Sequence, residues 1–398
     1  MEITMDMLQT VGAASLVFLL GRYLRQHVAF FEKYFIPAPV IGGLLFSIIV
    51  FALGRLGWLH FNFDNTLQDF FMNLFFTCTG FTCSWVTLKK SGKLGLILAI
   101  GSVAFLFVQN LITLLLSGVF DISPLIGLTM GSMSMSGGVG SGVSFGPMLE
   151  SMGQEGATTI AVAAATFGLL LGSVIGGPVA HRLIKRYQLQ SSGQTTTSSD
   201  QPASSTGVTA TKKNMLDTVL WIMLGAFVGV YINKLLALTS LTFPYYVGCL
   251  FGGAVIRNIM DMREGSGSPI DFKLLDMYGG VFLNLFLSMA LMTLDLQKLM
   301  DLALPMVVIL LSQAVAMVIW ASIVTFRSLG KDYEAAVMAA GHCGVALGQT
   351  PNAIANMSAV IEKNGPAPTA WFVLPVVTVI FINICNPIII TFFINWVK

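Results

Sequence analysis

The chain has 398 residues, of which 55% are hydrophobic and 10% are charged, and its formal net charge is +2. No soluble core could hide that much apolar surface, so the composition indicates an integral membrane protein and excludes an ordinary soluble domain. A net charge this small gives no sign of a nucleic-acid partner.

Ten apolar segments have about the length that a membrane-crossing helix needs, which is about 20 residues. In the first half they lie at about 7–21, 34–54, 66–86, 95–119 and 157–180. In the second half they lie at about 215–237, 241–258, 275–294, 301–325 and 368–395. We therefore expect an all-α integral membrane protein with five crossings in each half.

Two further segments, 125–150 and 335–361, are rich in glycine and are predicted to be re-entrant hairpins that enter and leave on the same face. The first contains GSMSMSGGVGSGVSFGP at 131–147, with six glycines, five serines and no charge. A glycine inside a helix costs ~1 kcal/mol relative to alanine. Non-helical backbone at membrane depth persists only where protein buries it or where it lines a watery cavity. The first hairpin is therefore a candidate binding site.

Residues 191–211 separate the halves, and twelve of these 21 residues are Ser or Thr. A segment with so few large apolar side chains cannot bury enough surface to fold. We expect an N-terminal repeat at 1–186, a disordered cytoplasmic linker at 187–214 and a C-terminal repeat at 215–398.

Lys and Arg residues are distributed unevenly among the predicted loops. With the N-terminus outside, seventeen of them are cytoplasmic, and only Arg55, Lys234, Lys298 and Lys398 are external. Cytoplasmic loops of membrane proteins carry such an excess of positive charge. The chain is thus predicted to lie in the cell inner membrane with both termini periplasmic and the linker cytoplasmic.

Four residues recur at the same spacing in the two halves. They are Gln109, Gly137, Gly140 and Pro147 in the first half, and Gln313, Gly341, Gly344 and Pro351 in the second. Because each predicted half has an odd number of crossings, the two repeats would have opposite orientations in the membrane. Inverted repeats with paired broken segments are typical of secondary transporters, whose site lies near the midplane.

Four stretches of sequence also resemble a known family. They are SGGVGSG at 136–142, AAGHCGVALGQTPNAIANM at 339–357, IPAPVIGGLL at 36–45 and LFLSMALM at 285–292. In combination they closely resemble the bacterial sodium/glutamate symporters of the glutamate:sodium symporter family, over nearly the whole chain except the linker.

That resemblance implies sodium-coupled uptake of L-glutamate by alternating access. It also implies two five-helix domains of inverted topology, paired re-entrant loops, a homodimer and elevator-type movement. Family members often carry His at the third position of GGxGxG, where this chain has Val139. Another small carboxylate or acidic amino acid therefore stays an alternative substrate.

The hairpin tips supply the candidate substrate-binding residues. Glycines permit positive φ and close approach, so that N–H groups and the start of the following half-helix can point at a carboxylate. A β-carbon at Gly140 is expected to crowd the ligand path and to strain a left-handed backbone. The candidates are Ser136, Gly137, Gly138, Ser141 and Gly142 on the first tip, and Thr350, Pro351, Asn352 and Asn356 on the second. The alternatives are a Gly/Ser helix-packing face and caps on broken helices.

A third polar set lies within the apolar helices and is predicted to bind Na⁺, the only cofactor expected. Sodium prefers oxygen ligands, and amide or hydroxyl oxygens beside unwound backbone can provide them without a buried charge. The candidates are the side chains of Asn73, Thr77, Asn284 and Ser288 with the backbone of Gly140 and Gly344. The alternative is polar contact between helices, as for Gln109 and Gln313.

Nothing in the sequence favours an enzyme. His342 and Cys343 are adjacent, but neighbouring side chains point apart on a helix, so packing or hydrogen bonding is the preferred interpretation. The membrane segments hold no paired carboxylates, and no Walker motif is present. A channel is the less favoured alternative, because two sealed hairpin tips indicate alternating access.

Overall fold

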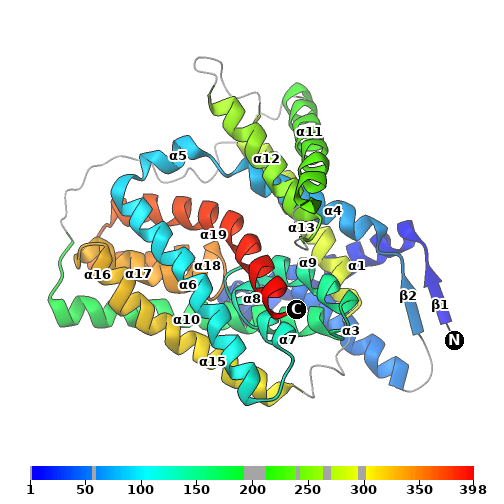
Figure 1. The fold of residues 1–398 in the computed structure, drawn as a ribbon, viewed down its shortest axis with the longest axis horizontal. Coiled ribbons are helices and arrows are strands. Elements are labelled where there is room, and N and C mark those ends of the chain that lie inside the picture. The colour runs from blue at the N-terminus through cyan, green and yellow to red at the C-terminus, as the bar shows by residue number, and fades with distance from the viewer. Residues whose placement is uncertain (1, 56–59, 192–211, 239–242, 263–269, 295–301) are drawn as a thin grey trace.

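Helices form most of the chain in the computed structural model, which describes residues 2–55, 60–191, 212–238, 243–262, 270–294 and 302–398 (Figure 1). The first half contains α1 (Met7–His27), α3 (Ala38–Arg55), α4 (Thr66–Phe81), α6 (Gly92–Val119) and α10 (Ala157–Tyr187). Short helices α2 (Ala29–Lys33) and α5 (Trp85–Lys90) lie between them. Each of the five predicted crossings therefore coincides with a helix.

The second half also contains five longer helices. It contains α11 (Lys212–Ala237), α12 (Tyr246–Asp261), α13 (Phe272–Met292), α15 (Ala303–Trp320) and α19 (Pro368–Val397). Helix α15 continues through the π-helical turn η1 (Ala321–Thr325) into α16 (Phe326–Ser328). The central part of the predicted linker, 192–211, lies outside the described residues. Of its described ends, Tyr187 is the last residue of α10, 188–191 are not helical, and 212–214 belong to α11.

Among the described residues, seven helices are long and apolar enough to cross a membrane, which confirms a multi-pass membrane protein. Helices α3, α4 and α12 have only 16 to 18 residues. At a rise of about 1.5 Å per residue, 16 residues reach about 24 Å, less than the ~30 Å of a bilayer core. The count of ten crossings therefore stays a prediction.

One element departs from the all-α prediction. Strands β1 (Glu2–Met5) and β2 (His60–Phe63) form a parallel pair in which Glu2 lies opposite His60. The rings of Phe61 and Phe63 stack with their centroids 5.8 Å apart, and such β-branched and aromatic sequences favour strands. The pair joins the N-terminus to the segment after α3, two places that the charge pattern predicts on the same side.

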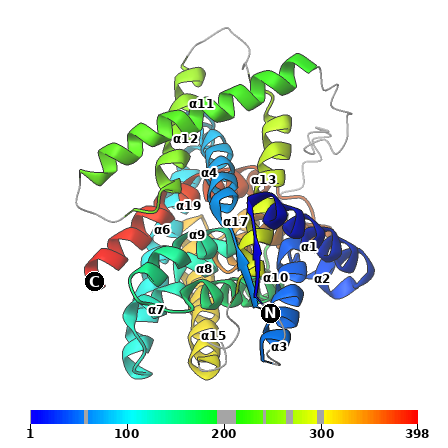
Figure 2. The same cartoon turned by 90° about the vertical axis from the view of Figure 1, so that its right-hand side faces the viewer.

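The helices pack into two groups, each drawn from both halves (Figures 1 and 2). The first group, here called the outer group, comprises α1, α3, α4, α11, α12 and α13. The second, the hairpin group, comprises α6 to α10 and α15 to α19. Within the outer group, the pair α1–α3 has its counterpart in α11–α12, and α3–α13 has its counterpart in α12–α4. Both halves thus contribute helices to each group, and the inverted repeats stay a prediction.

Small residues allow close helix crossings in the outer group. A Cβ on Gly21 would collide with the backbone oxygen of Ala38, where α1 crosses α3. A Cβ on Gly80 would collide with the backbone oxygen of Leu250, where α4 crosses α12. Lipid tails provide no hydrophobic force between helices, so close contact of this kind stabilises their association.

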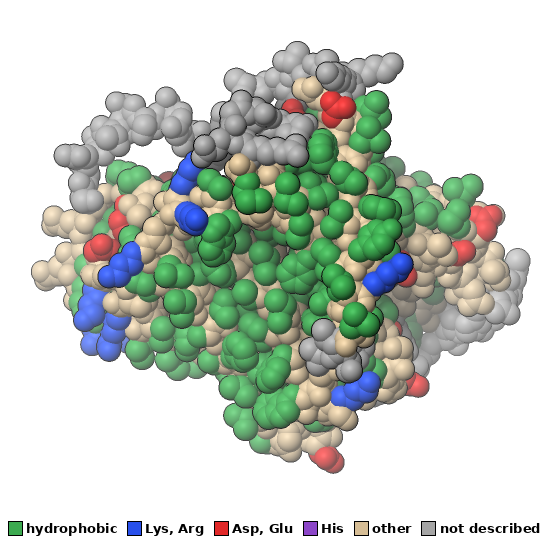
Figure 3. All heavy atoms as spheres, turned by 45° about the horizontal axis from the view of Figure 1, so that its top comes forward, with side chains coloured by type: hydrophobic (Ala, Val, Ile, Leu, Met, Phe, Trp, Pro, Cys, Tyr) green, Lys and Arg blue, Asp and Glu red, His purple; other side chains and the backbone are tan. Residues whose placement is uncertain are grey.

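Apolar side chains also cover the outside of the molecule, as expected for a surface in contact with lipid. Leu220, Phe227 and Leu235 of α11 are each more than half exposed. Figure 3 shows hydrophobic side chains spread over most of one face.

Hydrogen bonds between loops agree with the predicted sides. Ser84 Oγ donates to Asp261 Oδ2 at 2.6 Å, and Asn258 Nδ2 donates to Cys83 O at 2.9 Å. These segments are both predicted to be cytoplasmic. Asp64 N donates to Thr10 Oγ1 at 3.2 Å; Asp64 is predicted to be external, and Thr10 lies at the external end of the first predicted crossing. The pairing supports the relative topology, and the side that faces the cytoplasm stays a prediction.

Candidate functional site

The first glycine-rich segment forms three short helices, α7 (Pro124–Thr129), α8 (Ser132–Met135) and α9 (Gly138–Ser151). The chain breaks between them because Gly131 leaves helical geometry and Gly138 has a φ of +68°, which favours glycine over other residues. Every residue from 125 to 136 is buried, and so is Gly138. The broken backbone is therefore enclosed by protein, as its survival in a membrane requires.

The second segment is a hairpin of α17 (Tyr333–Ala346) and α18 (Thr350–Asn364). Its tip is the turn from Leu347 to Gln349, and Pro351 lies in the first turn of α18, where its missing N–H costs nothing.

The two tips meet inside the hairpin group. A Cβ on Gly138 would lie 2.9 Å from Nε2 of Gln349. Gln109 on α6 bridges the tips: its Nε2 donates to Ala346 O at 2.9 Å, and Ser136 Oγ donates to its Oε1 at 2.6 Å. Gln313 Nε2 on α15 donates to the backbone oxygen of Gln109 at 2.8 Å. Gln109 and Gln313 thus form polar contacts between helices, which is the role that the sequence analysis gives them.

A cavity of about 240 Å³ lies where the tips face the outer group. Its lining includes seven of the predicted site residues: Ser136, Gly137, Gly140, Ser141, Asn284, Thr350 and Pro351. The cavity therefore brings both tips together with α13, and its role as a shared binding site stays a prediction.

Further lining residues were not predicted from the sequence. Gln349 precedes Thr350 at the second tip, Thr378 and Asn383 come from α19, and Phe75 and Thr79 come from α4. Gln349 lies within the quoted motif at 339–357. The two α19 residues are polar positions in an apolar helix that also contains Pro375 and Pro387, and this combination was an available signal.

Two predicted substrate ligands lie elsewhere. Asn352 Nδ2 donates to Leu169 O at 2.8 Å, and Asn356 Nδ2 donates to Gly172 O at 2.8 Å. The asparagines share one face of α18, as their spacing predicts, but that face packs against α10 and does not line the cavity. Gly142 also packs on α10, because its Cβ would lie 3.0 Å from Ala161 Cβ.

The expected role of Gly140 needs a correction. The left-handed backbone belongs to Gly138, whereas Gly140 lies inside α9. A Cβ on Gly140 would meet only Phe75 Cε1, at 3.8 Å. The equal spacing in the sequence does not place the two prolines alike, because Pro147 lies within α9 while Pro351 opens α18.

The predicted Na⁺ ligands are only partly brought together. Asn284 and Gly140 line the cavity, but Asn73 lines a different pocket with Asp69 and Tyr245. Thr77 Oγ1 donates to Asn73 O at 2.8 Å. Ser288 Oγ is buried without a hydrogen-bond partner among the described residues, and Gly344 packs against Ala353 N. Within the described chain, no three His, Cys, Asp or Glu residues converge as metal ligands.

The chemistry of the cavity suits an anion with polar ends. None of its lining residues is charged. The N-termini of α9 and α18 both border it, and these helices have 14 and 15 residues. Helix N-termini carry unpaired N–H groups and a partial positive charge, so they attract carboxylates. Amides and hydroxyls around them can complete the hydrogen bonding.

His342 has a structural environment. Its Nε2 lies 3.2 Å from Ser102 Oγ, and its Nδ1 lies 2.9 Å from Thr325 Oγ1, at the π-helical turn η1. Cys343 is fully buried. The adjacent pair thus joins α17 to α6 and η1 by hydrogen bonding and packing, as the sequence predicts.

Comparison with known proteins gives consistent similarity over nearly the whole chain. The family model described as sodium/glutamate symporter matches residues 3–366. The sodium/glutamate symporter of Escherichia coli (strain K12) is 39% identical over 392 residues, which cover 97% of this chain and 96% of the relative. That of Haemophilus influenzae (strain ATCC 51907 / DSM 11121 / KW20 / Rd) is 35% identical over 393 residues, again covering 97% and 96%. The alignment with a solved sodium proton antiporter from Methanocaldococcus jannaschii covers 98% of this chain and 96% of the antiporter chain, at 14% identity and a TM-score of 0.44. This likeness is too weak to support an argument.

Proposed function

The chain belongs to the sodium/glutamate symporter family, and from that membership we propose that it takes up L-glutamate together with Na⁺ by secondary active transport. The related proteins are carriers, and the chain is a transporter and not an enzyme.

The cavity between the hairpin tips is the observation that carries this proposal. Glutamate has two carboxylates, and two helix N-termini border the cavity, those of α9 and α18. Each can attract one carboxylate through the positive end of its helix dipole. In the first turn of α18, Pro351 has no N–H and Asn352 N donates to Gln349 O at 3.0 Å, so the dipole and not a set of N–H donors is the proposed attraction there. Asn284 and Gln349 reach the same space and can bind the α-amino group through their amide oxygens. This arrangement recognises a dicarboxylate without a lysine or arginine.

Sodium coupling follows from the charge balance of the same cavity. A bound glutamate carries a net negative charge, and the cavity lining supplies no cationic side chain. Burying an uncompensated charge is costly, so a cation bound with the substrate lowers the cost of moving it. Neutral oxygens, including those of Asn284 and of the backbone near Gly140, are the proposed ligands. Asn73, Thr77, Ser288 and Gly344 do not line this cavity, and we propose them as cation contacts outside it.

For the mechanism, we propose alternating access by an elevator-type movement of the hairpin group against the outer group. The cavity lies between the two groups, with Asn284 and Phe75 on one side and both hairpin tips on the other. The corresponding helix pairs of the two halves support inverted repeats, since each half contributes the same elements to each group. We also propose a homodimer in the cell inner membrane, as the family resemblance implies.

The proposed topology is testable by labelling single cysteines in intact cells. A cysteine at Asp121 should react with an impermeant thiol reagent, because this residue begins the first hairpin on the proposed external side. A cysteine at Lys363 should react only after the cells are opened. Four of the five native thiols, those of Cys78, Cys83, Cys249 and Cys343, are buried, and Cys385 is half-buried in α19, so a Cys385→Ser background serves for the labelling. The reverse pattern of labelling would show that the orientation is inverted.

The proposed function is tested by uptake of radiolabelled glutamate into proteoliposomes. We expect accumulation with an inward Na⁺ gradient and none with a proton gradient in sodium-free buffer. Aspartate, citrate and succinate as competitors distinguish glutamate from other small carboxylates. Equal accumulation with a proton gradient alone would contradict sodium coupling.

A further inference from the structure

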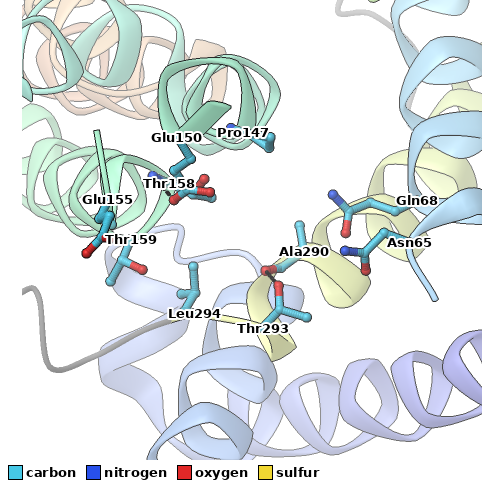
Figure 4. A pocket seen from close by; sticks show the side chains of 11 residues that line it. Asn65, Gln68, Pro147, Glu150, Glu155, Thr158, Thr159, Ala290, Thr293 and Leu294 are labelled. Atoms are coloured by element: carbon cyan, nitrogen blue, oxygen red, sulfur yellow. Dashed lines mark hydrogen bonds between the residues drawn. The ribbon is translucent and has the colours of Figure 1, made fainter. Parts of the chain in front are cut away.

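A second cavity, here called the outer pocket, has a volume of about 420 Å³ and lies apart from the glutamate cavity. It is lined by the end of α9 and the start of α10 on one side and by α4 and α13 on the other (Figure 4). The two cavities share no lining residue. Glu150 lies twelve residues after Gly138 on α9, which at about 1.5 Å per residue is about 18 Å along the helix.

The lining of the outer pocket is acidic and rich in oxygen. Glu150 and Glu155 contribute carboxylates, and no Lys or Arg is among the lining residues. Asn65, Gln68 and Thr158 add neutral oxygens. Carboxylates that line a concave surface raise the local concentration of cations. The negative charge of these carboxylates repels anions, including free glutamate.

Gln68 shows that the pocket has an unused ligand position. Its side chain is only 7% exposed, and its Oε1 has no hydrogen-bond partner among the described residues. In Figure 4, Gln68 and Asn65 extend from α4 toward the wall that carries Glu150 and Thr158. A buried carbonyl oxygen without a partner is uncommon, because its desolvation is not repaid.

Thr158 is a second such group on the opposite wall. It is 9% exposed, and its Oγ1 has no hydrogen-bond partner among the described residues. Its backbone N donates to Glu150 Oε1 at 3.0 Å, so the carboxylate of Glu150 is held in place. A carboxylate has about four lone-pair sites, and this bond uses one of them.

We infer that the outer pocket is a capture site for a monovalent cation, Na⁺, separate from the glutamate cavity. Two carboxylates with neutral oxygens in so large a space suit an ion that keeps part of its hydration shell. A divalent ion such as Ca²⁺ takes six to eight oxygens at close range, and Mg²⁺ demands a tighter geometry. The choice of Na⁺ and the external position of the pocket rest on the proposed function.

The test is equilibrium binding of radioactive sodium to the purified full-length protein without glutamate, at constant ionic strength set by choline chloride. Glu150→Gln removes the charge and retains an oxygen that accepts from Thr158 N. Gln68→Leu removes the unpartnered amide oxygen and breaks none of the described hydrogen bonds. Each is expected to raise the half-saturating Na⁺ concentration about fivefold. The effect of Glu150→Gln is modest because water in the open pocket screens the charge, and that of Gln68→Leu is modest because only one neutral oxygen is lost.

Asp121→Asn is the matched control, because Asp121 is an exposed acidic residue of the same hairpin region that does not line the outer pocket. Its half-saturating Na⁺ concentration should stay within twofold of the wild type. If Glu150→Gln and Gln68→Leu also bind sodium like the wild type, the outer pocket is no cation site. A different result would separate the two proposals. If sodium binding depends on Glu150 but glutamate uptake does not depend on Na⁺, the outer pocket is a cation site and the proposed function is wrong.

Discussion

Replacing Gly140 with leucine is expected to abolish most glutamate uptake while the protein still folds. Gly140 faces the cavity of about 240 Å³, and a Cβ there would meet only Phe75 Cε1, at 3.8 Å. Leucine is a better helix former than glycine, so α9 loses nothing locally. Its side chain would occupy the space of the substrate, and overpacking a filled site costs roughly 1 to 3 kcal/mol. At 1.4 kcal/mol per factor of ten, apparent glutamate affinity should fall roughly 5-fold to 150-fold.

Three further variants separate this effect from unfolding. Gly140→Ala should transport nearly like the wild type, since a methyl group fits without displacing a neighbour. Gly101→Leu makes the same change in α6, where a Cβ would meet nothing within 4 Å. Glutamate uptake by this variant should equal that of the wild type. Gly142→Leu should reduce the yield of folded protein, because that position packs on Ala161. Normal uptake by Gly140→Leu would show that this cavity is not the glutamate site.

The positions of the helices were predictable because apolar runs of about 20 residues have few alternatives in a membrane. Their ends were less predictable, because tertiary contacts determine them. The segment predicted at 66–86 ends as a helix at Phe81, and the next residues turn to bond Asn258 of α12. The strand pair was missed for the same reason. Its two strands are separated by α1 to α3, and such short strands carry little signal.

The glycine motif indicated where the chain breaks between the short helices α8 and α9, because few other structures tolerate so many glycines in an apolar chain. It did not say which side chains face the cavity. Asn352 and Asn356 were predicted to share a face, and they do, but the direction of that face depends on how α18 packs against α10. Gln349 was missed because a residue in a turn belongs to no periodic pattern.

Replacing Gln109 with leucine is expected to weaken both folding and glutamate uptake. The change removes the hydrogen bonds from Gln109 Nε2 to Ala346 O and from Ser136 Oγ to Gln109 Oε1. A buried hydrogen bond contributes about 0.5 to 1.5 kcal/mol, and interhelical bonds in membranes average ~0.6 kcal/mol. The free energy of unfolding in mixed micelles should fall by about 1 to 3 kcal/mol. Uptake should fall further, because these bonds fix one hairpin tip against the other.

Gln313→Leu is the matched control for this variant. It removes one hydrogen bond, from Gln313 Nε2 to Gln109 O, and also removes Oε1, which has no partner among the described residues. Losing the hydrogen bond destabilises the fold, and removing the buried unpartnered oxygen stabilises it by a similar amount. The unfolding free energy of Gln313→Leu should therefore change by less than about 1 kcal/mol. Ser136→Ala combined with Gln109→Leu should cost less than the sum of the two single changes, because both remove the same bond. Strict additivity, or a larger effect from Gln313→Leu than from Gln109→Leu, would show that Gln109 does not join the hairpin tips.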